Sequence, residues 1–233
     1  MPRAQLPLDL ALSPALGRVD FLVAPCNAAA LAWLDRWPDW PGAALALWGP
    51  AGCGKTHLGE IWRARAGAAR IDAHAISAAR VPELVGSAKA ALVDDADHAD
   101  ETGLLHLHNV LRDRPGHLLV VAREAPARWG IALADLRSRL LAAPAVAVEA
   151  PDEALIGAVL VKLLADRQLR VGEDVVAYLL VQIERSFAAA REIVAALDAA
   201  SLADGRRVTV PLAREVLTRL RDRGRAPSVS ERG

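Results

Sequence analysis

The chain has 233 residues, of which 53% are hydrophobic and 24% charged, and its 28 basic residues balance 28 acidic ones. This composition is typical of a folded soluble protein, and no uncharged run approaches the roughly 20 residues of a membrane-spanning helix. A neutral chain creates no overall field that would steer it onto nucleic acid, so any DNA contact must be local or made through a partner, and the indirect contact is the expected one. Cys26 and Cys53 are the only cysteines, and the N-terminus lacks a signal-peptide pattern, which together favour a reducing cytoplasm.

Short apolar runs and helical patterns alternate along the first 150 residues. Residues 43–48 are apolar and stop at Gly49-Pro50, which is typical of a buried strand that enters a turn. Further strands are predicted at 70–72, 90–94, 117–122 and 145–148, with helices near 55–66, 101–114 and 135–142. The alternation predicts the α/β class, with a parallel sheet, helices on both of its faces and right-handed crossovers.

The pattern changes after Pro151-Asp152, where apolar residues recur at helical spacing. Three such stretches lie at 155–164, 175–183 and 212–220. They predict a helical subdomain that is joined to the α/β part near residue 150. The expected layout is an N-terminal segment at 1–19, an α/β core at 20–150, a helical lid at 151–223 and a disordered tail at 224–233.

Residues 49–56 form a candidate phosphate-binding loop between a predicted strand and a predicted helix. Their sequence, Gly-Pro-Ala-Gly-Cys-Gly-Lys-Thr, has the spacing G-x-x-x-x-G-K-T that this loop requires. Gly49, Gly52 and Gly54 let backbone N–H groups wrap the phosphates, and the new helix presents its positive N-terminus to them. Lys55 is expected to reach the outer phosphates and Thr56 to hold Mg²⁺. A chance glycine turn is the alternative, but one of only three lysines falls where the loop needs it.

Two adjacent carboxylates end the predicted strand at 90–94. Asp94 at the strand tip is expected to bind the water shell of Mg²⁺, and Asp95 to orient an attacking water molecule. Two acids after a strand are also compatible with a simple turn. The phosphate-binding loop upstream favours the metal and water roles.

Residues around these motifs narrow the class of nucleotide-binding protein. The segments 21–27, 45–58, 94–95, 104–109 and 135–140 resemble, in order and spacing, the ATPase domain of the bacterial replication initiator DnaA. The resemblance extends from about residue 20 to about residue 220. It implies a P-loop AAA+ fold with a C-terminal α-helical lid, and ADP or ATP with Mg²⁺ as cofactors.

The same resemblance implies roles for further residues. Arg139 follows Ser138 where the family carries its arginine finger, and Arg137 is the nearby alternative. A guanidinium supplied in trans neutralises charge on the transferring phosphoryl group. Arg191 is expected to sense phosphate from the lid, although a salt bridge on the surface is the competing role and Arg185 lies six residues earlier. The resemblance also implies that Asn27 contacts the adenine, and it places His57 among the residues at the nucleotide.

The chain differs from the full initiators of this family at both ends. Those initiators carry a helix-turn-helix that reads DNA at their C-terminus, whereas only a few residues follow the last predicted helix here. In this respect the chain resembles the short regulatory members of the family, the Hda group, which place one AAA+ domain behind a clamp-binding peptide. The segment 5–10 is the candidate for that peptide, because a glutamine amide can enter a polar notch while two leucines enter an apolar groove. Packing of this apolar segment on its own domain is the alternative. Its expected contact residues are Gln5, Leu6, Leu8 and Leu10.

The resemblance therefore implies a negative regulator of replication initiation. Its expected partners are the sliding clamp, which is the DNA polymerase III beta subunit, and DnaA, whose bound ATP it would hydrolyse through Arg139. No membrane partner is expected, and self-association is left open. The predicted strand at 117–122 ends without the polar residue that relatives use to orient water, so intrinsic hydrolysis is expected to be weak. The alternatives are a self-assembling ATPase that uses Asp95, and a helicase loader or adaptor of the DnaA family.

Overall fold

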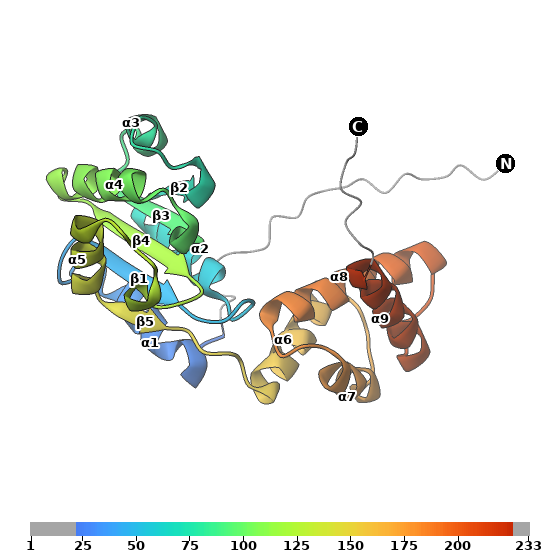
Figure 1. Cartoon of the computed structure of the whole chain (residues 1–233). Helices are drawn as coiled ribbons and strands as arrows, with labels where there is room; N and C mark the ends of the chain where they lie inside the picture. The colour runs from blue at the N-terminus through green and yellow to red at the C-terminus, as the bar shows by residue number, and fades with distance from the viewer. Residues whose placement is uncertain (1–21, 226–233) are drawn as a thin grey trace, which may run out of the picture.

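The computed structural model describes residues 22–225, in which an α/β lobe and a helical lobe follow one another along the chain (Figure 1). The α/β lobe contains, in chain order, α1 (Pro25–Asp35), β1 (Ala44–Trp48), α2 (Lys55–Ala66), β2 (Ala69–Asp72), α3 (Val81–Val85), β3 (Ala90–Asp94), α4 (Glu101–Asp113), β4 (His117–Ala122), α5 (Ala134–Ala142) and β5 (Ala145–Ala147). The helical lobe contains α6 (Glu153–Asp166), α7 (Glu173–Gln182), α8 (Phe187–Asp204) and α9 (Val210–Arg225).

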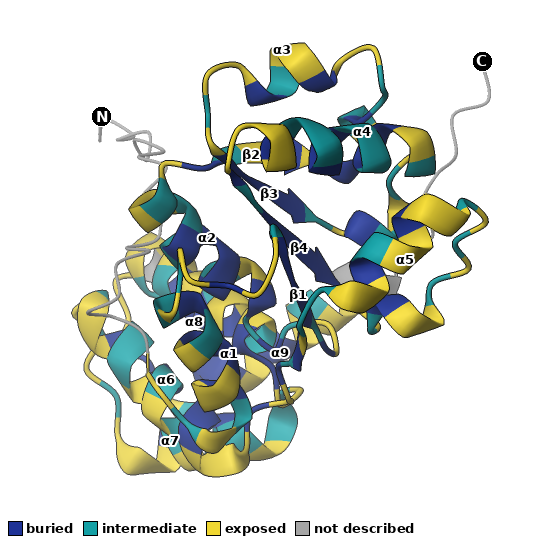
Figure 2. Cartoon of the chain, turned by 90° about the vertical axis from the view of Figure 1, so that its left-hand side faces the viewer, coloured by how far each residue is buried: buried dark blue, intermediate teal, exposed yellow. Residues whose placement is uncertain are grey.

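The five strands form one sheet of order β2-β3-β4-β1-β5, and every neighbouring pair is parallel. Successive residues of a strand point to opposite faces, and here both faces are buried. Leu45, Leu47 and Leu119 pack on the face that α1 and α2 cover. Ala46 and Val120 pack on the other face, with α3, α4 and α5. Figure 2 shows the buried strands between these two layers, and the predicted α/β class is confirmed.

Two helices of the α/β lobe have no counterpart among the predicted ones. α1 begins with Pro25 at its first position, where the missing N–H is tolerated. Its alanines favour a helix but give little apolar contrast between its two sides, so periodicity does not reveal it. α3 is only five residues long. The other observed strands and helices lie within one residue of their predicted bounds in the α/β lobe.

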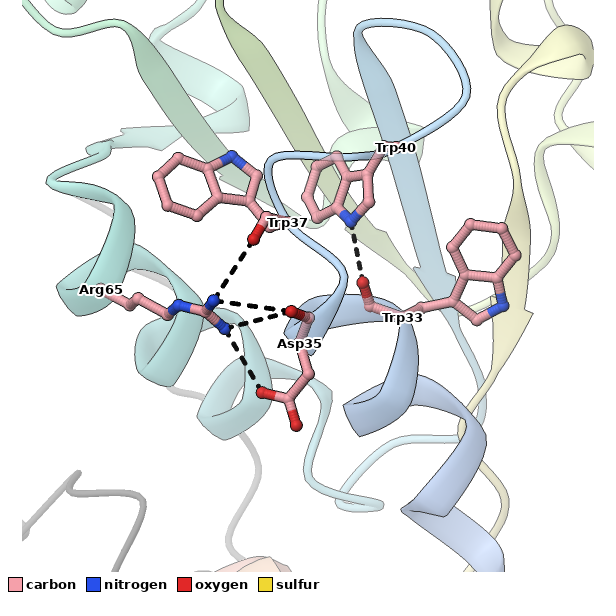
Figure 3. A network of polar contacts seen from close by, with 5 residues as sticks. All are labelled: Trp33, Asp35, Trp37, Trp40 and Arg65. Carbon is pink, nitrogen blue, oxygen red and sulfur yellow. Dashed lines mark hydrogen bonds and ion pairs between the residues drawn. The ribbon is translucent and has the colours of Figure 1, made fainter.

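Tryptophans and the side chain of Arg65 fix the C-terminal half of α2 against the loop that precedes β1, and Figure 3 shows the contacts of Arg65 with Asp35 and Trp37. Trp62 is 1% exposed, stacks on Trp40 at 5.3 Å and meets Trp37 edge to face at 6.3 Å between ring centroids. Arg65 donates to the Asp35 carboxylate at 3.4 Å and to the Trp37 carbonyl at 3.3 Å. Because α2 starts directly after the phosphate-binding loop, this cluster anchors the helix that carries the loop.

The helical lobe has its own apolar core, which all four of its helices share. Asp152 caps α6 by accepting from the Leu155 N–H at 2.8 Å, and Ser186 caps α8 by accepting from the Ala189 N–H at 3.1 Å. α9 continues through Arg225, so it includes the first two residues of the segment that was predicted to be a tail. None of the helices within residues 22–225 is both long and apolar enough to cross a bilayer. The predicted clamp-binding residues Gln5, Leu6, Leu8 and Leu10 lie outside the described residues.

Candidate nucleotide-binding site

The loop of residues 49–54 joins the carboxyl end of β1 to α2, and at Gly49 and Gly52 it is packed too closely for a side chain. A Cβ atom added at Gly49 would lie 2.1 Å from the Val148 carbonyl oxygen, and one at Gly52 would lie 2.7 Å from the Ser186 Cβ. Gly54, which precedes α2, has φ +100°, a conformation that favours glycine. The loop thus ends at the N-terminus of a 12-residue helix, which is the arrangement that favours the binding of phosphate groups.

Lys55 is the first residue of α2, and its side chain folds back into the loop. Its ammonium donates to the Gly49 carbonyl at 2.8 Å and to the Pro50 carbonyl at 2.7 Å, and it lies 3.7 Å from the Cys53 sulfur. Lys55 is only 8% exposed. A buried positive charge is therefore held within the loop, where it complements the negative charge of phosphates.

Thr56 and Asp94 meet across the carboxyl edge of the sheet. The Thr56 hydroxyl donates to the Asp94 carboxylate at 2.9 Å, and the other carboxylate oxygen accepts from the Asp95 N–H at 3.1 Å. Asp95 itself has φ +51°, which is uncommon outside glycine but tolerated by aspartate. The structure thus brings together the two oxygen groups that the sequence assigns to Mg²⁺, and hard oxygen ligands of this kind fit that ion.

The N-terminus of α8 packs directly on the phosphate-binding loop, a contact that sequence reasoning did not predict. The Phe187 N–H donates to the Gly52 carbonyl at 2.9 Å. The Phe187 ring would lie 3.2 Å from a Cβ atom at Gly54. In the sequence, Ser186 before an alanine-rich stretch indicates the start of a helix, but it does not indicate what the start of that helix contacts. The lid therefore touches the loop through its backbone as well as through side chains.

The two arginines considered for the lid differ in what they contact. Arg185 donates to the Glu153 carboxylate at 2.8 Å and so links the starts of α6 and α8. Arg191 is exposed on α8 and has no hydrogen-bond or ion-pair partner among residues 22–225. Arg191 lies one helical turn beyond Ala188, and Ala188 is close to the phosphate-binding loop: a Cβ atom added at Gly52 would lie 3.6 Å from the Ala188 Cβ. Arg191 is therefore the one whose guanidinium remains available for a ligand.

Asn27 is buried in α1, with 1% of its surface exposed. Its side-chain oxygen accepts from the Ala24 N–H at 2.9 Å, and its amide nitrogen donates to the Leu22 carbonyl at 3.0 Å. In this arrangement Asn27 fixes the path of residues 22–26, and the predicted adenine contact stays a prediction. His57 follows Thr56 on α2 and is partly buried.

Arg139 lies on α5 and forms a two-point ion pair within that helix. Its Nε and Nη2 donate to the two Asp135 carboxylate oxygens at 3.1 Å and 3.0 Å. The Arg139 side chain is 21% exposed, whereas Arg137 on the same helix is exposed. Asp135 therefore holds the candidate arginine finger in a defined orientation.

The lid is also the part of the chain that matches a family model, which is described as "Hda, lid domain" and covers residues 156–217. A comparison with curated proteins gives no match. Among solved structures, domain III of DnaA from Thermotoga maritima is similar at 20% identity and a TM-score of 0.73, over 89% of this chain and 98% of that one. The chain therefore has the fold of domain III of DnaA, and its residues 156–217 are similar to the lid of Hda.

Two further structures agree on this AAA+ fold. AMPPCP-bound DnaA from Aquifex aeolicus is 18% identical with a TM-score of 0.64, over 91% of this chain and 71% of that one. A RuvB mutant from Thermotoga maritima is 11% identical with a TM-score of 0.64, over 84% of this chain and 68% of that one. The predicted AAA+ fold with a C-terminal helical lid is therefore confirmed.

The carboxyl end of β4 offers no polar side chain to the site. Leu119, Val120, Val121 and Ala122 are at most 2% exposed, and the exposed Arg123 follows them. A water molecule near Asp95 would therefore have no second polar group from this strand to orient it. This is the structural basis for expecting weak intrinsic hydrolysis.

Replacing Asp94 with asparagine tests the pairing with Thr56. The substitution keeps the size of the side chain but removes its charge, so Mg²⁺ should bind about 10- to 100-fold more weakly in the presence of ADP. Magnesium titrations of a fluorescent ADP complex measure this change. Asp113→Asn, which alters a carboxylate that is 74% exposed at the end of α4, is the matched control. An unchanged Mg²⁺ affinity in Asp94→Asn would remove Asp94 from the metal site.

Proposed function

We propose that this protein is a nucleotide-binding negative regulator of DNA replication initiation. It binds ADP or ATP with Mg²⁺, docks on the DNA-loaded sliding clamp, and stimulates hydrolysis of the ATP that is bound to DnaA. The observation that carries this proposal is the match of residues 156–217 to the Hda lid model. The α/β lobe that precedes this lid contains a loop that fits phosphates.

The loop and the Thr56–Asp94 pair support nucleotide and Mg²⁺ as cofactors. Gly49, Gly52 and Gly54 would expose their backbone to the phosphates, Lys55 would neutralise them, and Thr56 with Asp94 would hold the ion. Bound Mg²⁺ would supply further positive charge at the outer phosphates. A structure of similar fold, DnaA from Aquifex aeolicus, carries AMPPCP, which supports the same kind of ligand here.

Arg139 is the group that would act on the partner. To reach ATP on DnaA, its guanidinium must exchange the Asp135 carboxylate for phosphoryl oxygens, which offer the same two-point geometry. The weak hydrolysis expected of this chain fits such a role, because completing a partner's site requires a bound nucleotide but no turnover of its own.

The central experiment mixes ATP-loaded DnaA with clamp on DNA and follows a single turnover of hydrolysis with and without this protein. We expect the rate to rise in its presence. An unchanged rate, with clamp present and the protein loaded with ADP, rules out the regulatory function. Steady ATP turnover by the isolated protein, rising with its own concentration, would favour the self-assembling ATPase instead.

Deleting residues 1–10 tests the clamp-binding peptide in the same assay. We expect the deletion to abolish stimulation on clamp-loaded DNA and to leave nucleotide affinity unchanged, because the segment precedes the described α/β lobe. Direct binding to the isolated clamp, measured by surface plasmon resonance, should be lost in parallel. Stimulation that survives the deletion would assign clamp contact to another surface.

A further inference from the structure

The start of α5, the helix that carries Arg139, is held by a carboxylate from another helix. Glu101 is the first residue of α4. Its two carboxylate oxygens accept hydrogen bonds from the Ala132 N–H at 3.0 Å and from the Leu133 N–H at 2.7 Å. α4 and α5 lie beside each other on the same face of the sheet (Figure 2). Glu101 thus joins two segments that are about 30 residues apart in the chain.

The start of α5 depends on this contact because the helix lacks a capping side chain of its own. Leu133 occupies the N-cap position, and a leucine has no oxygen that could accept from the first N–H groups of a helix. Residues 130–133 form neither helix nor strand. The negative charge of Glu101 also lies near the positive end of α5, where a carboxylate stabilises a helix. Glu101 therefore supplies what the local sequence does not.

The first turn of α4 is itself fixed in place. The Asp100 carboxylate caps α4 by accepting from the Gly103 N–H at 2.7 Å. A Cβ atom added at Gly103 would lie 2.6 Å from the Ile76 Cγ2 and 2.9 Å from the Ser77 Cα. Because α4 packs this closely on the segment after β2, Glu101 reaches the start of α5 from a well-defined position.

A shift at the start of α5 would be passed on to Arg139. Asp135, which holds the Arg139 guanidinium at 3.1 and 3.0 Å, is the second residue of this helix. The buried Leu136 and Leu140 hold one side of α5 in the core, and Glu101 fixes where the helix begins. A group that must meet a transition state can lose about a hundredfold in rate when it is displaced by about 1 Å.

We infer that Glu101 is a positioning residue for Arg139: it fixes the start of α5 and, through Asp135, the direction of the guanidinium. The inference rests on the proposed function, in which Arg139 acts on ATP that is bound to DnaA. Loss of the Glu101 carboxylate should therefore lower the rate of that hydrolysis, while the affinity for the partner and for ADP stays unchanged.

The orientation of Arg139 can be followed by ¹H–¹⁵N NMR of the arginine Nε–H groups in the full chain. The Arg139 Nε–H donates to Asp135, so its signal reports on this ion pair. Glu101→Gln removes the charge and leaves one accepting oxygen, and we expect it to shift or broaden that signal. Arg63, whose Nε–H donates to Glu60 on α2, is the internal control and should be unchanged. An unchanged Arg139 signal in both Glu101→Gln and Glu101→Ala would overturn the inference.

The second measurement is single-turnover hydrolysis of DnaA-bound ATP on clamp-loaded DNA, over a range of concentrations of this protein. Glu101→Ala should lower the rate at saturation about 10- to 100-fold and leave the half-saturating concentration as in the wild type. Glu101→Gln should recover part of the lost rate, because its amide oxygen still accepts a hydrogen bond. Glu173→Gln removes the charge from the first residue of α7, and this matched control should stimulate as the wild type does.

Two results would reduce Glu101 to a structural role and overturn the inference. One is a loss of rate that a higher concentration of the variant restores, and the other is a shifted Arg139 signal without any loss of rate at saturation. If Glu101→Ala does not fold, Glu101→Gln decides both measurements. If the wild type itself fails to stimulate, the proposed function is wrong, and the NMR measurement alone decides whether Glu101 orients Arg139.

Discussion

Arg139→Ala should reduce hydrolysis of DnaA-bound ATP to the rate seen without this protein. An arginine finger contributes about 10³- to 10⁵-fold to rate, so the expected loss is the whole stimulation. Single-turnover hydrolysis on clamp-loaded DNA measures it. Because the Arg139 side chain pairs only with Asp135 among residues 22–225, and on its own helix, alanine should leave the fold and the nucleotide affinity of the chain intact.

Two further variants make the assignment of Arg139 specific. Arg139→Lys keeps the charge but cannot reproduce the two-point geometry, so it should restore little activity. Arg137→Ala removes an exposed guanidinium from the same helix and should stimulate as the wild type does. If Arg137→Ala loses stimulation while Arg139→Ala retains it, the finger is Arg137.

Lys55→Ala should weaken ADP binding about a hundredfold, since charge-assisted contacts to phosphate contribute about 1.5–3 kcal/mol each. The substitution also removes the hydrogen bonds from the Lys55 ammonium to the Gly49 and Pro50 carbonyls, at 2.8 and 2.7 Å, which stabilise the conformation of the loop. Isothermal titration calorimetry with ADP and Mg²⁺ measures the affinity. The rise in melting temperature that ADP produces should disappear in parallel.

The control for Lys55 is Lys89→Ala, which removes one of the other two lysines from an exposed position before β3. Its affinity for ADP should equal that of the wild type. If Lys55→Ala also binds ADP normally, the loop does not bind phosphates, and the nucleotide-dependent part of the proposed function is wrong.

The α/β part of the fold was predictable because each buried strand is a short apolar run with clear ends. β3 and β4 have the predicted bounds, and the remaining strands differ by one residue. The G-x-x-x-x-G-K-T spacing likewise predicts a loop whose position between β1 and α2 is confirmed. Both signals are local, since they depend on residues that are adjacent in the chain.

Contacts between distant segments could not be predicted in the same way. Nothing in the sequence places Phe187 on Gly52, because that hydrogen bond depends on how the lid packs against the loop. The burial of Asn27 follows from α1, a helix that composition did not reveal.

The bond between Gly52 and Phe187 ties the geometry of the phosphate loop to the angle of the lid. If nucleotide binds as proposed, a peptide unit that turned when a phosphate left would pull on the first residue of α8, and an 18-residue helix would convert a small tilt at its start into a larger displacement at its far end. The position of the outer surface of the lid would then depend on which nucleotide is bound.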